Sequence, residues 1–177
     1  IPYRGLTTAT AKAYGILDTP EKTYFSYYGP DSATIPIAAK VRLPDKQFST
    51  VGEWKEAQLF GQQLFSGGGK YVTIFEGEYD AAAGYQMQGS KYPCVSVRNG
   101  ASAALKDCKA AYEWLDTFDA IVVCFDSDDV GQKAAREVAE LFGGKSAVMK
   151  HPPQYKDAND YLMDNNIKDF AAAFWAA

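Results

Sequence analysis

The sequence predicts an α/β fold: a mostly parallel four-stranded sheet flanked by helices and preceded by a small α+β subdomain. Short apolar segments alternate with helical patterns from residue 71 onward, and these segments are apolar on both faces. That pattern is typical of a parallel sheet covered by helices on each side. Residues 1–66 are instead rich in Tyr, Thr and Pro and contain short alternating stretches, which favour an antiparallel sheet.

Four apolar runs are the predicted parallel strands: 71–75, 92–97, 120–125 and 146–149. Helical patterns occupy 78–88, 102–115, 129–142, 158–164 and 168–175. Ser102 is the expected N-cap of the second helix, and Gly89 and Gly143 are expected to end the first and third. Because strands and helices alternate, the crossovers between strands are expected to be right-handed.

The N-terminal part is expected to form strands within 23–28 and 35–43. Three glycines at 67–69 form the expected hinge. The chain then divides into a basic α+β subdomain at 1–66, an α/β subdomain at 67–156 and C-terminal helices at 157–177. The glycines and Lys70 superficially resemble a phosphate-binding loop, but they precede a strand, whereas such a loop follows one.

Composition and charge limit the classes of function. The chain has 177 residues, 47% hydrophobic, with a net charge of −4, which excludes a disordered protein and disfavours a general nucleic-acid binder. No apolar run is long enough to span a membrane, and no signal peptide opens the chain. Three separated cysteines form no zinc motif and suit a reducing cytoplasm. The first residue is not Met, so we expect a piece of a longer protein.

Acidic residues follow two of the predicted parallel strands. Glu76 follows the first, and Asp126 and Asp128 follow the third. Because the carboxyl ends of parallel strands meet at one rim of a sheet, we expect these side chains to converge. Carboxylates this close raise one another's pKa, and a divalent cation would relieve the repulsion. Oxygen ligands without His or Cys favour Mg²⁺ or Mn²⁺.

Other acids near this rim have two explanations. Asp157 follows the fourth strand and is either a ligand or a helix N-cap. Asp80 and Asp129 lie in helix first turns, where a carboxylate is favourable without any metal. Asp160 is a further candidate. The sequence leaves open which of them completes the site and whether it holds one cation or two.

Candidate phosphate-binding groups lie in two places. They are Lys40, Arg42 and Lys46 in the N-terminal part and Arg98, Gly100 and Ser102 after the second parallel strand. Lys40 and Arg42 alternate to one face of a predicted strand, where they could contact phosphate, although by itself this pattern is more typical of a solvated strand face. The turn at Gly100 precedes a helix whose first N–H groups can bind an anion.

Several motifs occur in order along the chain. They are K-V-R at 40–42, K-x-F-x-T-x-G at 46–52, L-F-G at 59–61, E-G-E-x-D at 76–80, K-Y-P at 91–93, G-A-S-A at 100–103, F-D-x-D-x-x-G at 125–131 and K-D-A-N at 156–159. The acidic motifs resemble the TOPRIM signature of primases, topoisomerases, OLD-type nucleases and recombination mediator proteins. The whole series resembles the primase half of the fused primase–helicases of short-tailed bacteriophages.

The resemblance implies an RNA polymerase domain that makes short RNA primers on single-stranded DNA from ribonucleoside triphosphates by metal-dependent nucleotidyl transfer. It implies Glu76, Asp126 and Asp128 as catalytic and metal-binding acids and Asp157 as a further metal ligand. Mg²⁺ or Mn²⁺ is the expected cofactor. Lys40 and Lys46 match residues that contact nucleotide phosphates, and Arg42, Arg98, Gly100 and Ser102 complete the expected phosphate-binding set.

The resemblance also implies a place in a phage replisome in the cytoplasm of a bacterial host, away from membranes. The family's zinc-binding and helicase domains would be partners, since neither motif occurs in this chain, and without the helicase we expect a monomer. Arg98-Asn99 replaces the family's usual Gly-His, which leaves the contacts of that turn open.

Three other functions fit part of the pattern. A TOPRIM nuclease would cut DNA with metal alone, and an inactive TOPRIM module would only bind DNA or partner subunits. A receiver-like domain phosphorylated on Asp126 shares the α/β plan but gives Glu76 no role. A topoisomerase needs a tyrosine nucleophile on another domain, which 177 residues cannot also hold.

Overall fold

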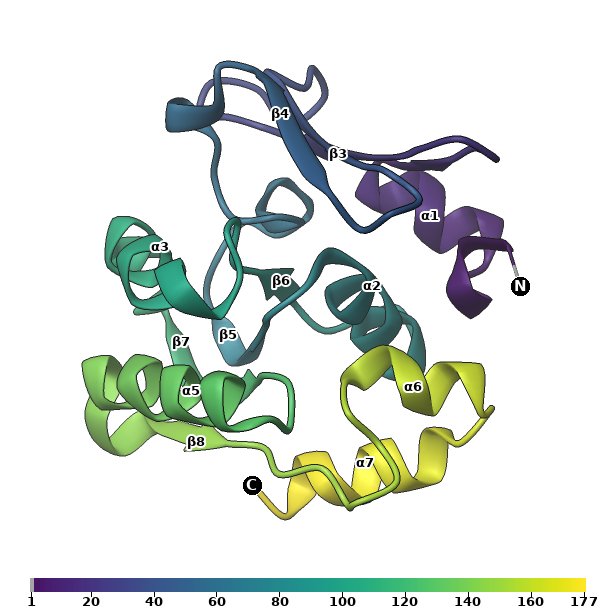
Figure 1. Ribbon diagram of the computed structural model, residues 1–177. Helices are drawn as coiled ribbons and strands as arrows, with labels where there is room; N and C mark the ends of the chain where they lie inside the picture. The colour runs from purple at the N-terminus through teal and green to yellow at the C-terminus, as the bar shows by residue number, and fades with distance from the viewer. Residues whose placement is uncertain (1) are drawn as a thin grey trace.

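Two four-stranded sheets organise the protein, whose computed structural model describes residues 2–177 (Figure 1). The first sheet is antiparallel and comprises β1 (Ile16–Asp18), β2 (Thr23–Tyr27), β3 (Ala38–Arg42) and β4 (Phe48–Gly52), in that order. The second is parallel, in the order β6-β5-β7-β8, and comprises β5 (Gly69–Phe75), β6 (Cys94–Ser96), β7 (Phe118–Cys124) and β8 (Ser146–Val148).

Seven α-helices accompany the sheets within the described residues. They are α1 (Thr8–Tyr14), α2 (Glu78–Met87), α3 (Ala104–Ala110), α4 (Tyr112–Leu115), α5 (Asp129–Phe142), α6 (Ala158–Met163) and α7 (Ile167–Trp175). Figure 1 shows α3 and α5 on one side of the parallel sheet and α2, α6 and α7 on the other. The expected parallel sheet with helices on both faces, preceded by an antiparallel subdomain, is therefore confirmed.

Alternation along β7 explains why both faces of the parallel sheet are covered. Ile121 and Val123 pack into the cluster formed with α3 and α5, whereas Val122 and Cys124 pack into the cluster formed with α2 and α6. Side chains two apart share a face, so a strand that is apolar at every position needs helices on each side.

The antiparallel sheet shares one core with the α2 face of the parallel sheet. Phe25 and Phe60 lie in the same buried cluster as Phe75 and Tyr79. An antiparallel bridge pairs Phe60 with Ser96 at the edge of the parallel sheet. The shared cluster and the bridge therefore join the two sheets into one packed body.

Two local expectations need correction. The helix expected over 102–115 is broken into a 3₁₀ turn (Ala101–Ala103) followed by α3 and α4. Ser102 lies exposed in that turn and is not an N-cap, because backbone carbonyls already accept the N–H groups of Ala103 and Ala104. β5 begins at Gly69, the last of the three glycines, and their role as a hinge stays a prediction. None of the helices in residues 2–177 has the length and apolar character needed to cross a membrane.

Candidate active site

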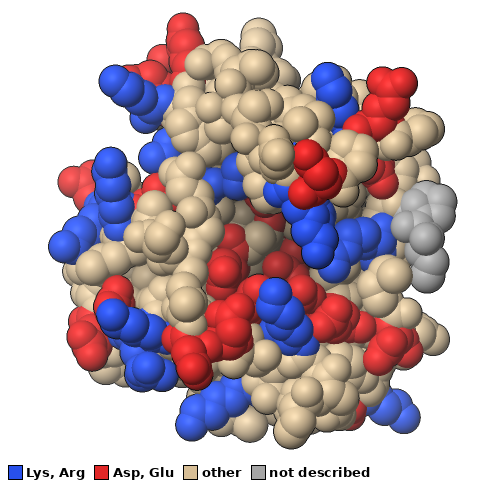
Figure 2. All heavy atoms as spheres, in the orientation of Figure 1, with Lys and Arg blue, Asp and Glu red and all other residues tan. Residues whose placement is uncertain are grey.

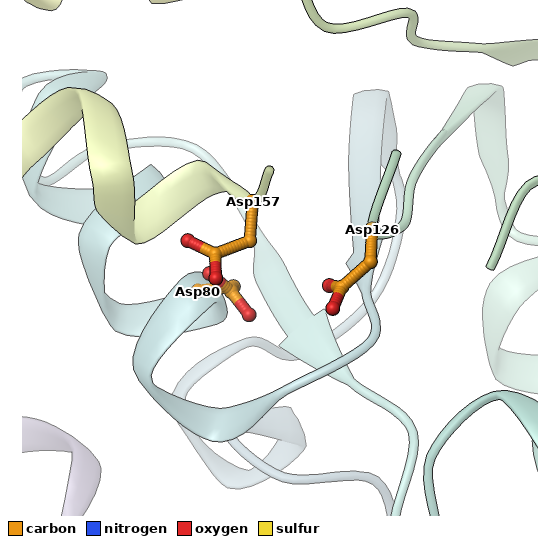
Figure 3. A group of neighbouring side chains, drawn as sticks. All are labelled: Asp80, Asp126 and Asp157. Carbon is orange, nitrogen blue, oxygen red and sulfur yellow. The ribbon is translucent and has the colours of Figure 1, made fainter. Parts of the chain in front are cut away.

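Three aspartates from three elements meet beside the carboxyl ends of β5 and β7 (Figure 3). Asp80 lies in the first turn of α2, Asp126 follows β7, and Asp157 is the N-cap of α6. One carboxylate oxygen of each lies within 4.8 Å of the others. These are oxygen ligands at a spacing that suits one divalent cation.

Asp80 is the most enclosed of the three carboxylates, with 9% of the residue exposed. Its Oδ1 accepts the backbone N–H of Asn159 at 2.9 Å, which joins the start of α2 to α6. Burial, then the charges of Asp157 and Asp126, raise the pKa of Asp80.

Glu76 lies next to this group, and its Oε2 accepts the backbone N–H of Asp126 at 3.1 Å. Burial, and then repulsion by Asp126, raise the pKa of Glu76 to about 7. Burial, and then repulsion by Asp157, raise the pKa of Asp126 to about 6, although Lys156 Nζ lies 3.5 Å from Asp126 Oδ2. Burial and mutual repulsion thus make ionisation of these carboxylates unfavourable. A bound divalent cation would offset that repulsion.

Asp128, expected to be a metal ligand, has a different local partner. Its Oδ1 accepts the N–H of Gly131 at 2.7 Å and caps α5. It lies outside the group of three aspartates, although its charge contributes to the raised pKa of Glu76. Its part in metal binding stays a prediction.

The two other acidic candidates lie outside the three-aspartate group. Asp160 Oδ2 accepts the backbone N–H groups of Lys156 at 2.8 Å and Asp157 at 3.4 Å, forming a capping box with Asp157. Asp129 is exposed in the first turn of α5. Asp80 therefore completes the group, although the sequence alone left open whether it is a ligand or only a favourable acid in a helix first turn. Its E-G-E-x-D spacing from Glu76 was the available signal.

A cleft of about 520 Å³ separates the acids from the antiparallel sheet. Its lining includes Lys40, Phe48, Ser49 and Thr50 on the sheet side, Arg98, Asn99 and Gly100 on the loop after β6, and Glu76, Gly77, Glu78, Asp80 and Asp126 below. Figure 2 shows this hollow, with acidic atoms along its lower side and basic atoms along its upper side. A space of this size accommodates a small ligand.

Lys40 projects from β3 toward α2 and is largely buried. Its ammonium group pairs with Glu78, which also accepts the hydroxyl of Tyr27 at 2.7 Å. Arg42 lies on the same face of β3, since both cations lie within 6.0 Å of the Phe48 ring centroid. The expected shared face of Lys40 and Arg42 is therefore observed, while their contact with phosphate stays a prediction.

Lys46 is exposed in the turn between β3 and β4, where it adopts a φ of 66°. It lines a smaller hollow together with Arg4, Arg42 and Tyr79, beside the main cleft. Lys22 also lines this hollow, which therefore gathers four cations, and Arg4 lies over the Tyr79 ring, 5.2 Å from its centroid.

Arg98 is part of the junction between the two sheets. Its guanidinium donates to the carbonyls of Trp54 at 2.8 Å and Ala57 at 2.9 Å and pairs with Asp107 at 3.3 Å. Gly100, with a φ of 70°, turns the chain beside it. These contacts explain a structural role for Arg98; the phosphate-binding roles of Arg98, Gly100 and Ser102 stay predictions.

Comparison with known proteins identifies the family. Residues 73–162 match the family described as Toprim-like, a segment that contains Glu76, Asp80, Asp126 and Asp157. The chain belongs to the Toprim-like family. Domains of this family bind divalent metals, and the partly buried aspartate group agrees with that property.

Relatives of this Toprim-like chain include phage replication proteins. The DNA helicase/primase of Enterobacteria phage T3 is 43% identical over 142 residues, which are 80% of this chain and 25% of that protein. The chain thus spans a quarter of that relative's length.

Solved structures agree with this relationship. The primase fragment of the bacteriophage T7 primase-helicase is 35% identical, with a TM-score of 0.85 over 99% of this chain and 73% of that one. A second T7 structure contains lagging-strand DNA polymerase and two primase domains bound to an RNA/DNA hybrid and dTTP. The match to a chain of that structure covers 99% of this chain and 89% of the matched chain, with 35% identity and a TM-score of 0.84. The expected TOPRIM fold and primase resemblance are confirmed.

Proposed function

We propose that this chain is the catalytic domain of a DNA primase, which joins ribonucleotides into short RNA primers on a single-stranded DNA template. The observation that carries this proposal is the cleft, where Asp80, Asp126 and Glu76 face the basic strand β3. The T3 and T7 relatives, named as primases, support the same function.

The carboxylates fit a divalent cation because they are close, partly buried and, in the described residues, paired only with Lys156. Asp80, Asp126 and Asp157 would hold Mg²⁺ or Mn²⁺, with Glu76 beside them. When bound, such an ion would neutralise charge on the nucleotide triphosphate and would lower the pKa of the attacking hydroxyl. Glu76 also fixes the Asp126 backbone through its hydrogen bond, which holds the loop after β7 in place.

The cations of the antiparallel sheet bind phosphate in this proposal. Within residues 2–177 no carboxylate lies at ion-pair distance from Arg42, so its guanidinium is available to a phosphate. Lys46 is exposed beside it. Lys40 already pairs with Glu78 and so links β3 to the start of α2. Contacts to phosphates without base contacts make template binding weaken as salt rises.

The proposed partners follow from the same function. Single-stranded DNA is the template and ribonucleoside triphosphates are the substrates. We further propose that the domain works beside zinc-binding and helicase domains, in a phage replisome in the bacterial cytoplasm. The T3 relative, named a helicase/primase, supports the helicase partner.

Incorporation of labelled ribonucleotides tests the proposal. The assay supplies a ready-made diribonucleotide, a single-stranded DNA template and Mg²⁺ or Mn²⁺. We expect extension that is abolished by Asp126→Asn or Asp128→Asn, while both variants keep the folded far-ultraviolet spectrum. Unchanged turnover in either variant would contradict its assignment as a catalytic acid.

The same reactions separate the competing functions. Cleavage of the template when ribonucleotides are omitted would indicate a TOPRIM nuclease. Bound metal and DNA with neither extension nor cleavage would indicate a binding module. Either outcome would overturn the proposed primer synthesis.

A further inference from the structure

Phe48 is a large apolar residue left open to solvent at the cleft. It begins β4, which is an edge strand of the antiparallel sheet, and 56% of the residue is exposed. It lines the same cleft as Glu76, Asp80 and Asp126. Single exposed apolar residues are common on protein surfaces, so the exposure of Phe48 matters only together with its place in the cleft and its charged neighbours.

Two cations surround the Phe48 ring. Arg42 is its cross-strand partner, with Cζ 6.0 Å from the ring centroid, and Lys40 Nζ lies 5.5 Å from it. Arg42 has no ion-pair partner among residues 2–177. The ring thus offers an apolar surface next to a cation that is free to bind an anion.

This combination matches the chemistry of a nucleotide. A base has an apolar π-face, and its phosphate carries negative charge a few ångströms away. Aromatic side chains beside cations bind single-stranded nucleic acids in this way, whatever the base. Building on the proposed function, we propose that Phe48 is a stacking platform for a nucleobase whose phosphate binds Arg42.

Four variants of the full chain test the platform. Phe48→Leu keeps an apolar side chain but removes the π-face, whereas Phe48→Tyr keeps the ring. Val51→Ala is the matched control, because Val51 is 55% exposed on the same strand but does not line the cleft. Phe48→Trp adds a tryptophan to the three already in the chain, and the difference in emission between this variant and the wild type reports on stacking.

Binding is measured without catalysis, by quenching of 2-aminopurine fluorescence. One titration uses 2-aminopurine within a short single-stranded DNA, and the other uses 2-aminopurine ribonucleoside triphosphate. We expect quenching by the wild type, Phe48→Tyr and Val51→Ala. Phe48→Leu should lose the quenching and bind about ten-fold more weakly. If the loss occurs with the DNA, the base that stacks on Phe48 belongs to the template strand. If it occurs with the triphosphate, the base belongs to the free nucleotide.

Quenching and affinity of wild-type magnitude in Phe48→Leu would overturn the platform. If Phe48→Leu fails to fold, Phe48→Trp decides. Quenching by saturating DNA or nucleotide of the emission that this variant adds over the wild type supports stacking, and unquenched added emission refutes it. Primer extension is measured separately. If the wild type shows quenching but no primer extension, primer synthesis is refuted and the platform stands. If the wild type extends primers but Phe48→Leu changes neither quenching nor affinity, the platform is refuted and primer synthesis stands.

Discussion

Glu76 and Asp126 have raised pKa values of about 7 and about 6, caused first by burial and then by neighbouring carboxylates. The folded chain therefore keeps protons that the unfolded chain has released. The stability due to these groups is fully present below their ordinary pKa values of 4.5 and 3.8 and is lost as pH rises to about 7 and about 6.

Melting temperature against pH and metal checks this sign. Without divalent cations, we expect these groups to make the chain less stable at pH 8 than at pH 5. Saturating Mn²⁺, at about 100 times its Kd, should raise the melting temperature at pH 8 by about 5–10 °C. The shift should be smaller at pH 5 and absent in Asp126→Asn. An equal shift at both pH values would contradict the explanation.

Gly131 allows α5 to approach the acids closely. A Cβ at this position would lie 2.5 Å from the Asp126 carbonyl oxygen and 2.9 Å from Glu76 Oε2. We expect Gly131→Ala to lower the free energy of unfolding by about 1–3 kcal/mol and to weaken Mn²⁺ binding. Gly144→Ala is the control, since no atom lies within 4 Å of its added Cβ. Urea denaturation measures the free energy of unfolding of both variants. At an open helix position Gly→Ala stabilises a protein, so stabilisation by Gly131→Ala would contradict this packing.

At the scale of elements, Arg98 joins the segment after β4 to the loop after β6. It donates to the Trp54 and Ala57 carbonyls and pairs with Asp107, whose side chain is 1% exposed. We expect Arg98→Met to lower the free energy of unfolding by about 3 kcal/mol, because it leaves a buried carboxylate without its cation.

A double-mutant cycle in urea tests this junction. Adding Asp107→Asn to Arg98→Met should restore part of the lost stability, since the uncompensated charge is removed. Unchanged stability in Arg98→Met together with weaker nucleotide binding would instead favour a direct phosphate contact.

At the scale of the whole molecule, one core spans both sheets. Phe60 is fully buried and its ring lies within 5.9 Å, between centroids, of the rings of Tyr14, Phe25 and Tyr27. The same buried cluster reaches Phe75 and the C-terminal helices. The antiparallel and parallel sheets should therefore unfold together.

Circular dichroism at far- and near-ultraviolet wavelengths measures this cooperativity. We expect coincident transitions, and Phe60→Ala should lower the free energy of unfolding of the whole chain by about 3–5 kcal/mol. Two separate transitions would show that the parts fold independently.

Local signals explain which elements were predictable from the sequence. The segment 120–125 is apolar at every position, and this identified a strand buried on both faces, observed as β7. Strand β4 gave no such signal, because every residue in it is exposed. The break between α3 and α4 was missed since no Gly or Pro interrupts residues 104–115.

The site was predictable where chemistry follows strand ends. Asp126 follows a strong strand, and its place at the rim was derived from parallel topology. Asp80 could not be settled in this way, since a carboxylate in a helix first turn is favourable by itself. Its place depends on the packing of α2 against α6, a contact between residues 79 positions apart.

Binding of Mn²⁺ to Asp80→Asn is the most direct test of the aspartate site. The wild type, Asp80→Asn and Asp129→Asn are titrated with Mn²⁺ at pH 8, with free ion followed by electron paramagnetic resonance. Both residues lie in helix first turns, but only Asp80 belongs to the buried group. We predict that Asp80→Asn loses Mn²⁺ binding and Asp129→Asn keeps it. Wild-type affinity in Asp80→Asn would contradict the site.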